Sequence, residues 1–358
     1  MALSIGIVGL PNVGKSTLFN ALTDANALAA NYPFATIEPN TGIVPIPDER
    51  LAKLAELYKT DKIVPATVTF VDIAGLVAGA SQGEGLGNQF LAHIRSTNAI
   101  VQVVRAFDDG NIQNSGTSDP KKDIEIINTE LILADLQTVN NRLPRLEKEV
   151  KADAKLQPAL QLLQRVKAGL DEGKLAGSFL SKEELETIAD LQLLSAKPFI
   201  IVYNLSENQL TDQELKTNLA AIVSPAPAIF LSAKLESELR GLDEADRAEL
   251  LESYGQTESG LVQLIHAAYK ALGLQSYLTA GEKEVRAWTI AAGATAPQAA
   301  GVIHTDFERG FIAAQVVDYN DLISAGSETA ARAAGKLRTE GKTYQMRPND
   351  VVEFRFNV

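Results

Sequence analysis

The chain has 358 residues, of which 46% are hydrophobic and 22% charged, and its formal net charge is −12. This length allows two or three domains with sizeable cores. The absence of cysteine excludes disulfides and thiolate metal sites, and the negative charge argues against indiscriminate nucleic-acid binding. No apolar stretch approaches the roughly 18 residues that span a bilayer. We therefore expect a globular, cytoplasmic protein that does not engage a membrane.

The first expected strand, residues 3–8, leads into GLPNVGKST (residues 9–17) and then into a helix. This segment matches G-x-x-x-x-G-K-[ST] between a strand and a helix, the context that a phosphate-binding loop requires. Glycines let the backbone approach phosphates, and the N-terminus of the helix adds a positive end. We expect Lys15 to contact the β- and γ-phosphates, Ser16 to supply an oxygen to Mg²⁺ and Thr17 to hydrogen-bond a phosphate.

Two downstream segments fit the rest of a magnesium nucleotide site. Thr36 lies in the loop YPFATIEPN, where a switch segment would close over Mg²⁺ and the γ-phosphate. Asp72 ends an expected strand and starts the motif DIAG, so it can hold a metal-bound water while the N–H of Gly75 binds the γ-phosphate. The order of these parts predicts a Mg²⁺-dependent nucleoside-triphosphate hydrolase. Its expected catalytic residues are Lys15, Thr36, Asp72 and Gly75.

Leu76 follows the DIAG motif, at the place where typical GTPases have a glutamine that orients water. A hydrophobic side chain cannot align water, so we expect a low intrinsic rate of hydrolysis that a partner would raise.

Further strands are expected at 68–72, 99–104, 199–204 and 228–233. Because helical stretches separate them, they predict an α/β fold with a doubly wound, mostly parallel sheet. After about residue 277 the composition changes, and residues 284–358 predict a small α+β domain.

The stretch between the strands at 99–104 and 199–204 has a helical pattern. Its apolar residues follow a 4-3-4-3-4 spacing, which is typical of a coiled-coil seam, and helical spacing resumes after a polar break. The capping box Ser181-x-x-Glu184 begins a return helix through Leu191. We expect an antiparallel helical hairpin inserted into the nucleotide-binding domain. The apolar residues of the seam are Ile132, Leu136, Val139, Leu143, Leu146 and Val150.

Positive residues are frequent in this hairpin between Arg142 and Lys167, where they outnumber the acidic ones. They allow two interpretations. They form either a solvated helix face or a contact for ribosomal or other RNA.

The segment NLSE, residues 204–207, follows the strand at 199–204, at the sheet edge where α/β proteins bind ligands. A GTP-binding protein has Asn-Lys-x-Asp here, because guanine offers two donors that an aspartate accepts. Asn204 can instead donate to N7 of adenine and accept from its 6-amino group, as asparagine does on adenine in DNA. The backbone of Leu205 could reach N1, and Glu207, a methylene longer than aspartate, would turn away. We expect ATP to be preferred to GTP.

The segment Ser232–Lys234 ends the next strand, so Ser232 and Ala233 would lie over the base. The alternative is that NLSE is only a loop.

These motifs together resemble the YchF family of Obg-like ATPases, essentially from end to end. The resemblance rests on GLPNVGKST, DIAGLVAGASQGEGLGNQF, NLSE and the tail EVRAWTIAAGATAPQAAGVIHTDFERGF. It implies a nucleotide domain of the translation-factor GTPase class with altered base specificity, a helical coiled-coil insertion and a C-terminal TGS domain of β-grasp type. It also implies slow Mg²⁺-dependent ATP hydrolysis coupled to ribosome association, with a role in translation or stress responses.

Site residues follow from the same resemblance. Asn204 with Leu205 would contact adenine, and Ser16 with Thr36 would hold Mg²⁺. Asn12 resembles the asparagine of potassium-activated relatives, which raises the hypothesis of a K⁺ ion. Some relatives carry a histidine in the glycine-rich loop after DIAG, where this chain has Ser81. The residues expected to hold phosphates are Asn12, Val13, Gly14, Lys15, Ser16 and Thr17.

The expected domains are residues 1–128 plus 196–277 for nucleotide binding, 129–195 for the helical arm and 278–358 for the TGS domain. We expect a monomer that binds ATP and the ribosome, with RNA contacts through the arm or the TGS domain. Two alternatives stay open. One is an Obg-type GTPase, and the other is a regulatory binding module that senses the nucleotide and hydrolyses it only incidentally.

Overall fold

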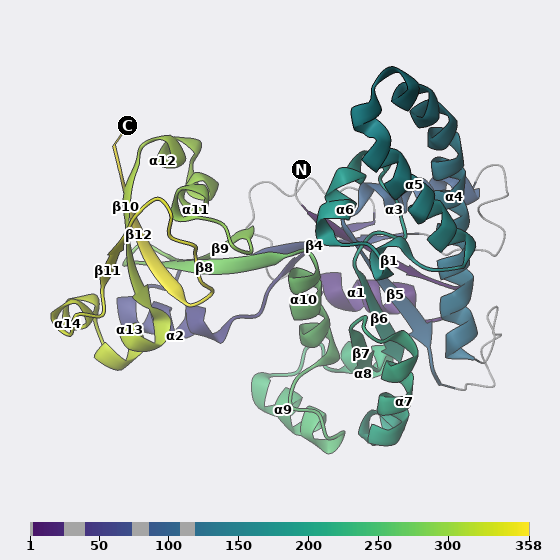
Figure 1. Cartoon of the computed structure of the whole chain (residues 1–358). Coiled ribbons are helices and arrows are strands. Elements are labelled where there is room, and N and C mark those ends of the chain that lie inside the picture. Colours follow the sequence, from purple (N-terminus) through teal and green to yellow (C-terminus); the bar gives the residue numbers. More distant parts are fainter. Residues whose placement is uncertain (1–2, 25–39, 74–85, 108–118, 358) are drawn as a thin grey trace. The chain divides into compact units, whose positions relative to one another are not determined.

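The computed structural model of the chain describes residues 3–24, 40–73, 86–107 and 119–357. The chain divides into two compact units, each formed by two separate segments (Figure 1). The N-terminal unit comprises Met1–Ile43 and Thr69–Ala268, and the C-terminal unit comprises Val44–Val68 and Tyr269–Val358.

The N-terminal unit is built on a six-stranded sheet with the order β2-β4-β1-β5-β6-β7. The pairs that join β4, β1, β5, β6 and β7 are all parallel, which confirms the predicted doubly wound sheet. Every residue of β5 is buried, as expected of a central parallel strand. The strands are β1 (Ser4–Gly9), β2 (Thr41–Pro45), β4 (Thr67–Asp72), β5 (Ala99–Arg105), β6 (Phe199–Asn204) and β7 (Ala228–Leu231).

Helices cover both faces of this sheet, with α1 on one side of β1 and α3 on the other (Figure 1). Side chains cap the N-termini of several of these helices. The Asp212 side chain accepts a hydrogen bond from the Leu215 N–H at the start of α7, and the Ser232 side chain accepts one from the Leu235 N–H at the start of α8. These helices are α1 (Lys15–Asp24), α3 (Leu86–Ser96), α7 (Gln213–Val223), α8 (Ala233–Glu238), α9 (Glu244–Ser253) and α10 (Gly260–Ala271).

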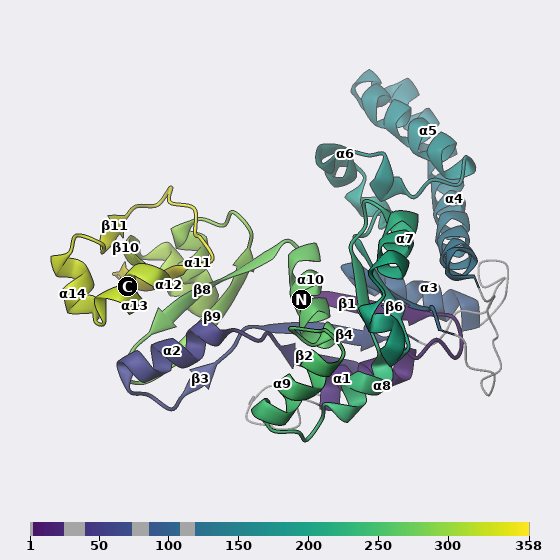
Figure 2. The ribbon, with the colours of Figure 1, turned by 90° about the horizontal axis from the view of Figure 1, so that it is seen from below.

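The predicted helical hairpin is present as α4 (Pro120–Ala152) packed against α5 (Gln157–Asp171) (Figure 2). Asp119 caps α4, Pro120 occupies its first turn, and Pro144 lies inside the helix without ending it. An apolar core joins the two helices to the residues that lead back to the sheet. Its fully buried members include Val139, Leu146, Leu163, Val166 and Leu170.

The predicted return helix through Leu191 is wrong in its length. The capping box forms as expected, but α6 (Lys182–Thr187) ends when Ile188 leaves helical geometry at φ −110° and ψ 16°. One 3-10 turn, η3 (Ala176–Ser178), precedes α6, and another, η4 (Ala189–Leu191), follows it. Burial of the Ile188 side chain in the apolar core of the hairpin accompanies this break.

The C-terminal unit is an α+β domain, as predicted for the tail, with sheet order β11-β10-β12-β8-β9-β3. Its core contains Tyr277, Ile290, Phe311, Val316 and Val352. Its strands are β3 (Ile63–Val64), β8 (Leu274–Ala280), β9 (Val285–Ala291), β10 (Phe311–Asp318), β11 (Arg338–Glu340) and β12 (Asp350–Phe356). Its helices are α2 (Glu49–Tyr58), α11 (Ala296–Ile303), α12 (Thr305–Arg309), α13 (Tyr319–Ala325) and α14 (Glu328–Ala333).

Residues 44–68 contribute α2 and β3 to the C-terminal unit, a grouping that the sequence analysis did not foresee. Strand β3 pairs in parallel with β9, and the Val285 N–H donates to the Lys62 carbonyl at 2.9 Å. The guanidinium of Arg50 in α2 donates to the Pro348 carbonyl at 2.6 Å and to Asn349 Oδ1 at 3.0 Å. The three-domain division of the sequence analysis stays a prediction. Across the four described ranges, no helix is both long and apolar enough to cross a membrane.

Candidate nucleotide-binding site

Four predicted segments of the site lie at one edge of the N-terminal sheet. The loop at residues 10–14 follows β1, Asp72 ends β4, Asn204 ends β6 and Ser232 follows β7. These strands are parallel, so their carboxyl ends meet at the same edge. The structure therefore brings together residues that are up to about 220 positions apart in the sequence.

The phosphate-binding loop requires glycine at two positions. Gly14 has a φ of +94°, and a Cβ there would collide with Nδ2 of Asn204. A Cβ on Gly9 would lie 2.8 Å from Cγ2 of Val13 and 2.9 Å from the carbonyl oxygen of Val103. Asn12 also has a positive φ, of 64°, in the turn between them. The loop thus lies directly against β5 and against Asn204, and side chains at the two glycines would push it away.

Helix α1 begins at Lys15 and presents polar side chains to the site. The Leu18 N–H donates to the Gly14 carbonyl at 2.9 Å, which starts the helix directly after the loop. The side chains of Ser16 and Thr17 are exposed, so their hydroxyls are accessible to a ligand at the helix N-terminus. This arrangement fits the phosphate roles that the sequence predicts for them.

Lys15 forms an ion pair with Asp72 through its ammonium group and Oδ1 of the carboxylate. Both side chains are mostly buried, and Asp72 is anchored by its backbone N–H, which donates to the Asn40 carbonyl at 2.8 Å. Lys15, which is predicted to bind phosphate, is thus in direct contact with Asp72, which is predicted to hold a water bound to the metal. A hydroxyl at Ser16 and a carboxylate at Asp72 are the hard oxygen donors that Mg²⁺ prefers, so these residues fit the ion that P-loop triphosphatases use.

Asn204 links the phosphate-binding loop to the segment after β7. Its Nδ2 donates to the Val13 carbonyl at 3.0 Å, and its Oδ1 accepts from the Ala233 N–H at 3.0 Å. The side chain is only 4% exposed. An amide has two N–H groups and two acceptor lone pairs, so one donor and one acceptor position are left for a base.

Leu205 and Ser232 have well-defined structural contacts of their own. The Leu205 N–H donates to the Leu231 carbonyl at 2.8 Å, so its expected contact with N1 of adenine would require that bond to open. The hydroxyl of Ser232 accepts from the Leu235 N–H at 3.3 Å and caps α8. Their contacts with a nucleotide stay predictions.

Glu207 pairs with Lys234 at 2.8 Å, between Oε1 and Nζ. The hydrogen bond from Lys234 lowers the pKa of this carboxyl below its usual value. The carboxylate that would accept from guanine in a GTPase is thus bound to a lysine of the neighbouring segment. The sequence predicts that Glu207 turns away from the base but does not indicate that Lys234 is its partner.

Thr36, Gly75, Leu76 and Ser81 lie outside the described residues. Their roles in holding Mg²⁺, binding the γ-phosphate and limiting hydrolysis stay predictions. The hydrogen bond that the Val13 carbonyl accepts from Asn204 was not predicted from the sequence. The spacing of the motifs held no signal for this contact, because a backbone carbonyl carries no residue signature.

The strand order, the glycine-dependent loop and the lysine at the start of α1 place the chain among the P-loop nucleoside triphosphatases. Residues 4–141 match the family model described as "50S ribosome-binding GTPase". Residues 274–357 match the model of the YchF GTPase C-terminal region, described as "Protein of unknown function (DUF933)".

Relatives align with the whole chain. The "Ribosome-binding ATPase YchF" of Bacillus subtilis is 51% identical over 366 residues, and that of Haemophilus influenzae is 50% identical over 363. Both alignments cover 100% of this chain and 100% of the relative. The structure of the Schizosaccharomyces pombe YchF GTPase has a TM-score of 0.87 and 41% identity, and covers 99% of this chain and 97% of that one. The chain belongs to the YchF family, which confirms the resemblance predicted from its motifs.

Proposed function

We propose that this chain is a ribosome-binding ATPase in which bound ATP acts as a switch. Full-length relatives at about half identity carry the name of ribosome-binding ATPases, and the phosphate-binding loop has the geometry of a triphosphatase. The observation that carries the choice of ATP is the pairing of Glu207 with Lys234, beside an asparagine that retains hydrogen-bonding capacity for a base.

The preference for ATP follows from the donors and acceptors of the two bases. Guanine presents N1–H and a 2-amino group, which require a carboxylate, and the Glu207 carboxylate is 2.8 Å from the Lys234 ammonium. Adenine presents an acceptor at N7 and a donor at the 6-amino group, which match the second N–H and the second lone pair of Asn204. One unmatched polar group costs about 1–3 kcal/mol, so ATP should bind roughly tenfold or more tightly than GTP.

Phosphate binding would begin by competition for Lys15. The triphosphate would attract the ammonium group away from Asp72, and the freed carboxylate would then help to hold Mg²⁺ through a water. Backbone N–H groups of residues 12–17 and the N-terminus of α1 hold the remaining phosphate charge. Ser16 and Thr36 would hold Mg²⁺, which would supply positive charge to the phosphoryl group that is transferred.

Hydrolysis is proposed to be slow without a partner, because Leu76 replaces a water-orienting glutamine. In this proposal Thr36 and the backbone of Gly75 respond to the γ-phosphate. A K⁺ ion at Asn12 remains a hypothesis, and equal ATP turnover in Na⁺ and K⁺ buffers would exclude it.

The helical arm is proposed to act as a solvated spacer in a monomeric, cytoplasmic protein. Arg142 donates to both carboxylate oxygens of Glu149, at 3.0 and 2.9 Å, and Lys167 pairs with Asp171 at 2.5 Å. Binding to RNA is driven by the counterions that protein cations displace from the phosphates. Cations that are already paired with carboxylates displace fewer of them, so these pairs favour the solvated face over an RNA contact.

Ribosome co-sedimentation tests this function directly. The full chain is mixed with ribosomes and ATP, ADP or GTP at several salt concentrations, and the bound fraction is measured. We expect ATP to change the bound fraction at concentrations where GTP does not. A steep decrease with salt would show an RNA contact through basic residues.

The alternative of a nucleotide-sensing module is tested by comparing two variants. Lys15→Ala removes phosphate binding, whereas Asp72→Asn is designed to retain ATP and impair its cleavage. In a sensor, only Lys15→Ala alters ribosome binding. If neither variant alters it, the switch is disproved.

A further inference from the structure

A second cavity lies on the opposite edge of the N-terminal sheet from the nucleotide-binding site. It has a volume of about 880 Å³ and is lined by residues of α3, α4 and the segment 189–197. Thr97 and Lys197, which line it, come just before β5 and β6, so the cavity is at the amino ends of these strands. Strand β5 has seven residues, which places the nucleotide edge about 20 Å away.

A smaller cavity of about 210 Å³ adjoins the first one. The two share four lining residues, and the smaller one adds a mostly apolar wall. The shared residues are Asn98, Ala189, Gln192 and Lys197, and the apolar wall is formed by Leu185, Ile188, Leu193, Ala196 and Pro198. The larger cavity alone falls within the size range of small-molecule pockets, and the smaller one extends it.

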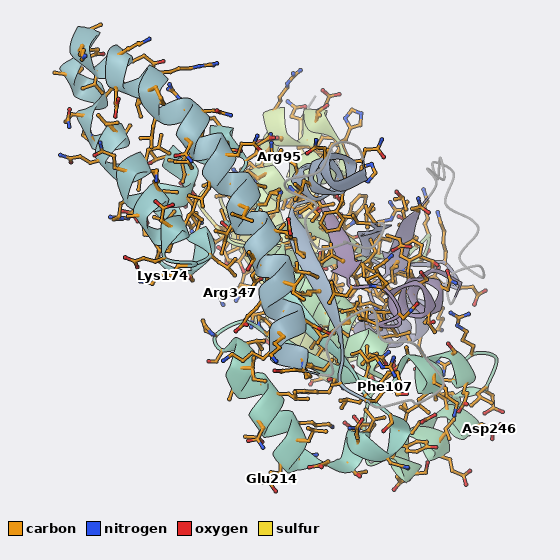
Figure 3. All side chains as sticks on the ribbon, turned by 90° about the vertical axis from the view of Figure 1, so that its right-hand side faces the viewer. Arg95, Phe107, Lys174, Glu214, Asp246 and Arg347 are labelled. Atoms are coloured by element: carbon orange, nitrogen blue, oxygen red, sulfur yellow. The ribbon has the colours of Figure 1, made fainter. Side chains whose placement is uncertain are left out.

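The charged side chains that line the two cavities are both positive: Arg95 on α3 and Lys197 before β6. Figure 3 shows Arg95 beside the long helix α4. The other polar side chains that line the larger cavity are amides, whose N–H groups can donate to an anion, and three hydroxyls, which already donate to backbone carbonyls. They are Asn88, Ser96, Thr97, Asn98, Gln137, Thr138, Asn141 and Gln192.

Arg95 has hydrogen-bonding capacity that the protein does not use. Its Nε is buried and has no hydrogen-bond partner within the described residues, although buried N–H groups are nearly always paired. Lys197 donates to the carbonyls of Thr97 and Arg95, and its pKa is lowered by burial and then by the nearby Arg95 charge. Two cations thus stand close together in a partly desolvated site.

The nearest acid does not neutralise these cations through a hydrogen bond. Asp135 is fully buried and accepts from the Leu194 N–H at 2.8 Å, the Ser195 N–H at 2.7 Å and the Ser195 hydroxyl at 2.6 Å. Burial raises the pKa of this carboxyl above its usual value. Asp135 attracts both cations electrostatically, but among the described residues no carboxylate lines either cavity, so a ligand there would meet positive charge.

We propose that this double cavity is a second ligand site that binds a small organic phosphate. The phosphate group lies on the guanidinium of Arg95 and the ammonium of Lys197, and the apolar part of the ligand fills the smaller cavity. A guanidinium matches the geometry of phosphate oxygens and binds them in a bidentate manner. The apolar annex favours a small organic molecule over an RNA backbone, which would have no apolar part to place there.

Naphthyl phosphate is a suitable probe, because it combines a phosphate group with a compact apolar ring system. Binding to the full chain is measured by calorimetry in saturating Mg²⁺·ADP, which occupies the nucleotide site. We expect one equivalent of probe to bind, and we expect inorganic phosphate and naphthol each to bind at least tenfold more weakly.

Variants locate the binding. Arg95→Met should weaken naphthyl phosphate binding at least tenfold, and Arg95→Lys should retain part of it. Arg165→Met, a control on α5 whose partner is Glu184, should bind like the unchanged chain. Lys15→Ala, measured without nucleotide, should also bind the probe normally, because it alters only the other site.

Ala189→Trp gives an independent check that does not remove a buried group. Ala189 is exposed and lines both cavities, so a tryptophan there should block the probe. The proposal is overturned if the ADP-loaded chain shows no saturable binding, or if both Arg95→Met and Ala189→Trp bind like the unchanged chain. It is also overturned if an RNA oligonucleotide binds in an Arg95-dependent way and naphthyl phosphate does not.

Discussion

Asn204 at the end of β6 donates a hydrogen bond to the Val13 carbonyl at 3.0 Å, and so ties the segment predicted to bind the base, residues 204–207, to the phosphate-binding loop. Gly14 leaves the space for this contact, since a Cβ there would strike the Asn204 amide. The two halves of the nucleotide site are therefore joined before a nucleotide binds.

Asn204→Ala should weaken both the fold and nucleotide binding. The change leaves the Ala233 N–H and the Val13 carbonyl without their partner, and each unpaired buried group costs about 1–3 kcal/mol of unfolding free energy. Urea denaturation measures the stability, and fluorescent ATP titration should show at least a tenfold loss of affinity. The exposed Asn208→Ala is the matched control. Equal ATP affinity in both variants would contradict this role of Asn204.

Gly14→Ala should abolish detectable ATP binding at concentrations that saturate the unchanged chain. The substitution combines backbone strain at a φ of +94° with a collision against Asn204. Gly173→Ala separates the two effects, because Gly173 has a φ of +77° and nothing within 4 Å of a new Cβ. That control should lose about 1 kcal/mol of stability and keep its ATP affinity. The same loss of affinity in both variants would show that the collision is unimportant.

Leu205→Lys combined with Glu207→Asp should move base preference toward GTP. The shorter aspartate loses its reach to Lys234 and can accept from guanine, and the lysine restores the residue that guanine readers carry there. The ratio of ATP to GTP affinity should fall at least tenfold in competition binding. Glu238→Asp, which alters the second acidic partner of Lys234 at 3.6 Å, should leave the ratio unchanged. An unaltered ratio in the double variant would disprove the assignment of this segment to base recognition.

Lys234→Met should change how stability depends on pH. The hydrogen bond from Lys234 lowers the pKa of Glu207 from its model-compound value of 4.5. The folded state therefore binds this proton more weakly than the unfolded state does. The stabilisation is present above about pH 4.5 and is lost as the pH falls through the lower, folded-state pKa. Carboxyl NMR titration should show the Glu207 pKa rising in the variant. An unchanged Glu207 pKa would mean that the ion pair does not persist in solution.

Asp135→Ala should destabilise the attachment of the helical arm to the sheet. Asp135 on α4 accepts three hydrogen bonds from Leu194 and Ser195, all of them buried. Removal of the carboxylate leaves these donors unpaired, which should lower the unfolding free energy by about 3 kcal/mol or more. Urea denaturation measures the loss, and the exposed Asp190→Ala serves as the control. A loss below 1 kcal/mol would indicate that water replaces the carboxylate.

Five of the six strands of the N-terminal sheet could be predicted from the sequence, and three of them, β1, β5 and β6, are apolar runs buried over almost their whole length. Strand β2, whose burial alternates, was not predicted. The start of the return helix was equally clear from the Ser181–Glu184 capping box, which forms as predicted. Its end was not, because no glycine or proline marks Ile188, and the break coincides with the packing of that side chain in the core of the hairpin. Helix α2 was missed although Asp48 caps it. Strand β3 was missed because it has only two residues and is defined by its partner β9.

The sequence by itself determined the family and predicted the chemistry of the nucleotide site. A phosphate-binding loop is encoded by glycines, a lysine and hydroxyls within nine consecutive positions, and local backbone preferences are enough to specify it. Only the tertiary structure decided that Asn204 holds Val13, that Glu207 pairs with Lys234, and that residues 44–68 join the C-terminal unit. These contacts join segments that pair through backbone groups or through common charged residues. Such groups carry no distinctive pattern in the sequence, and the folding of the chain alone selects which of many equivalent partners they meet.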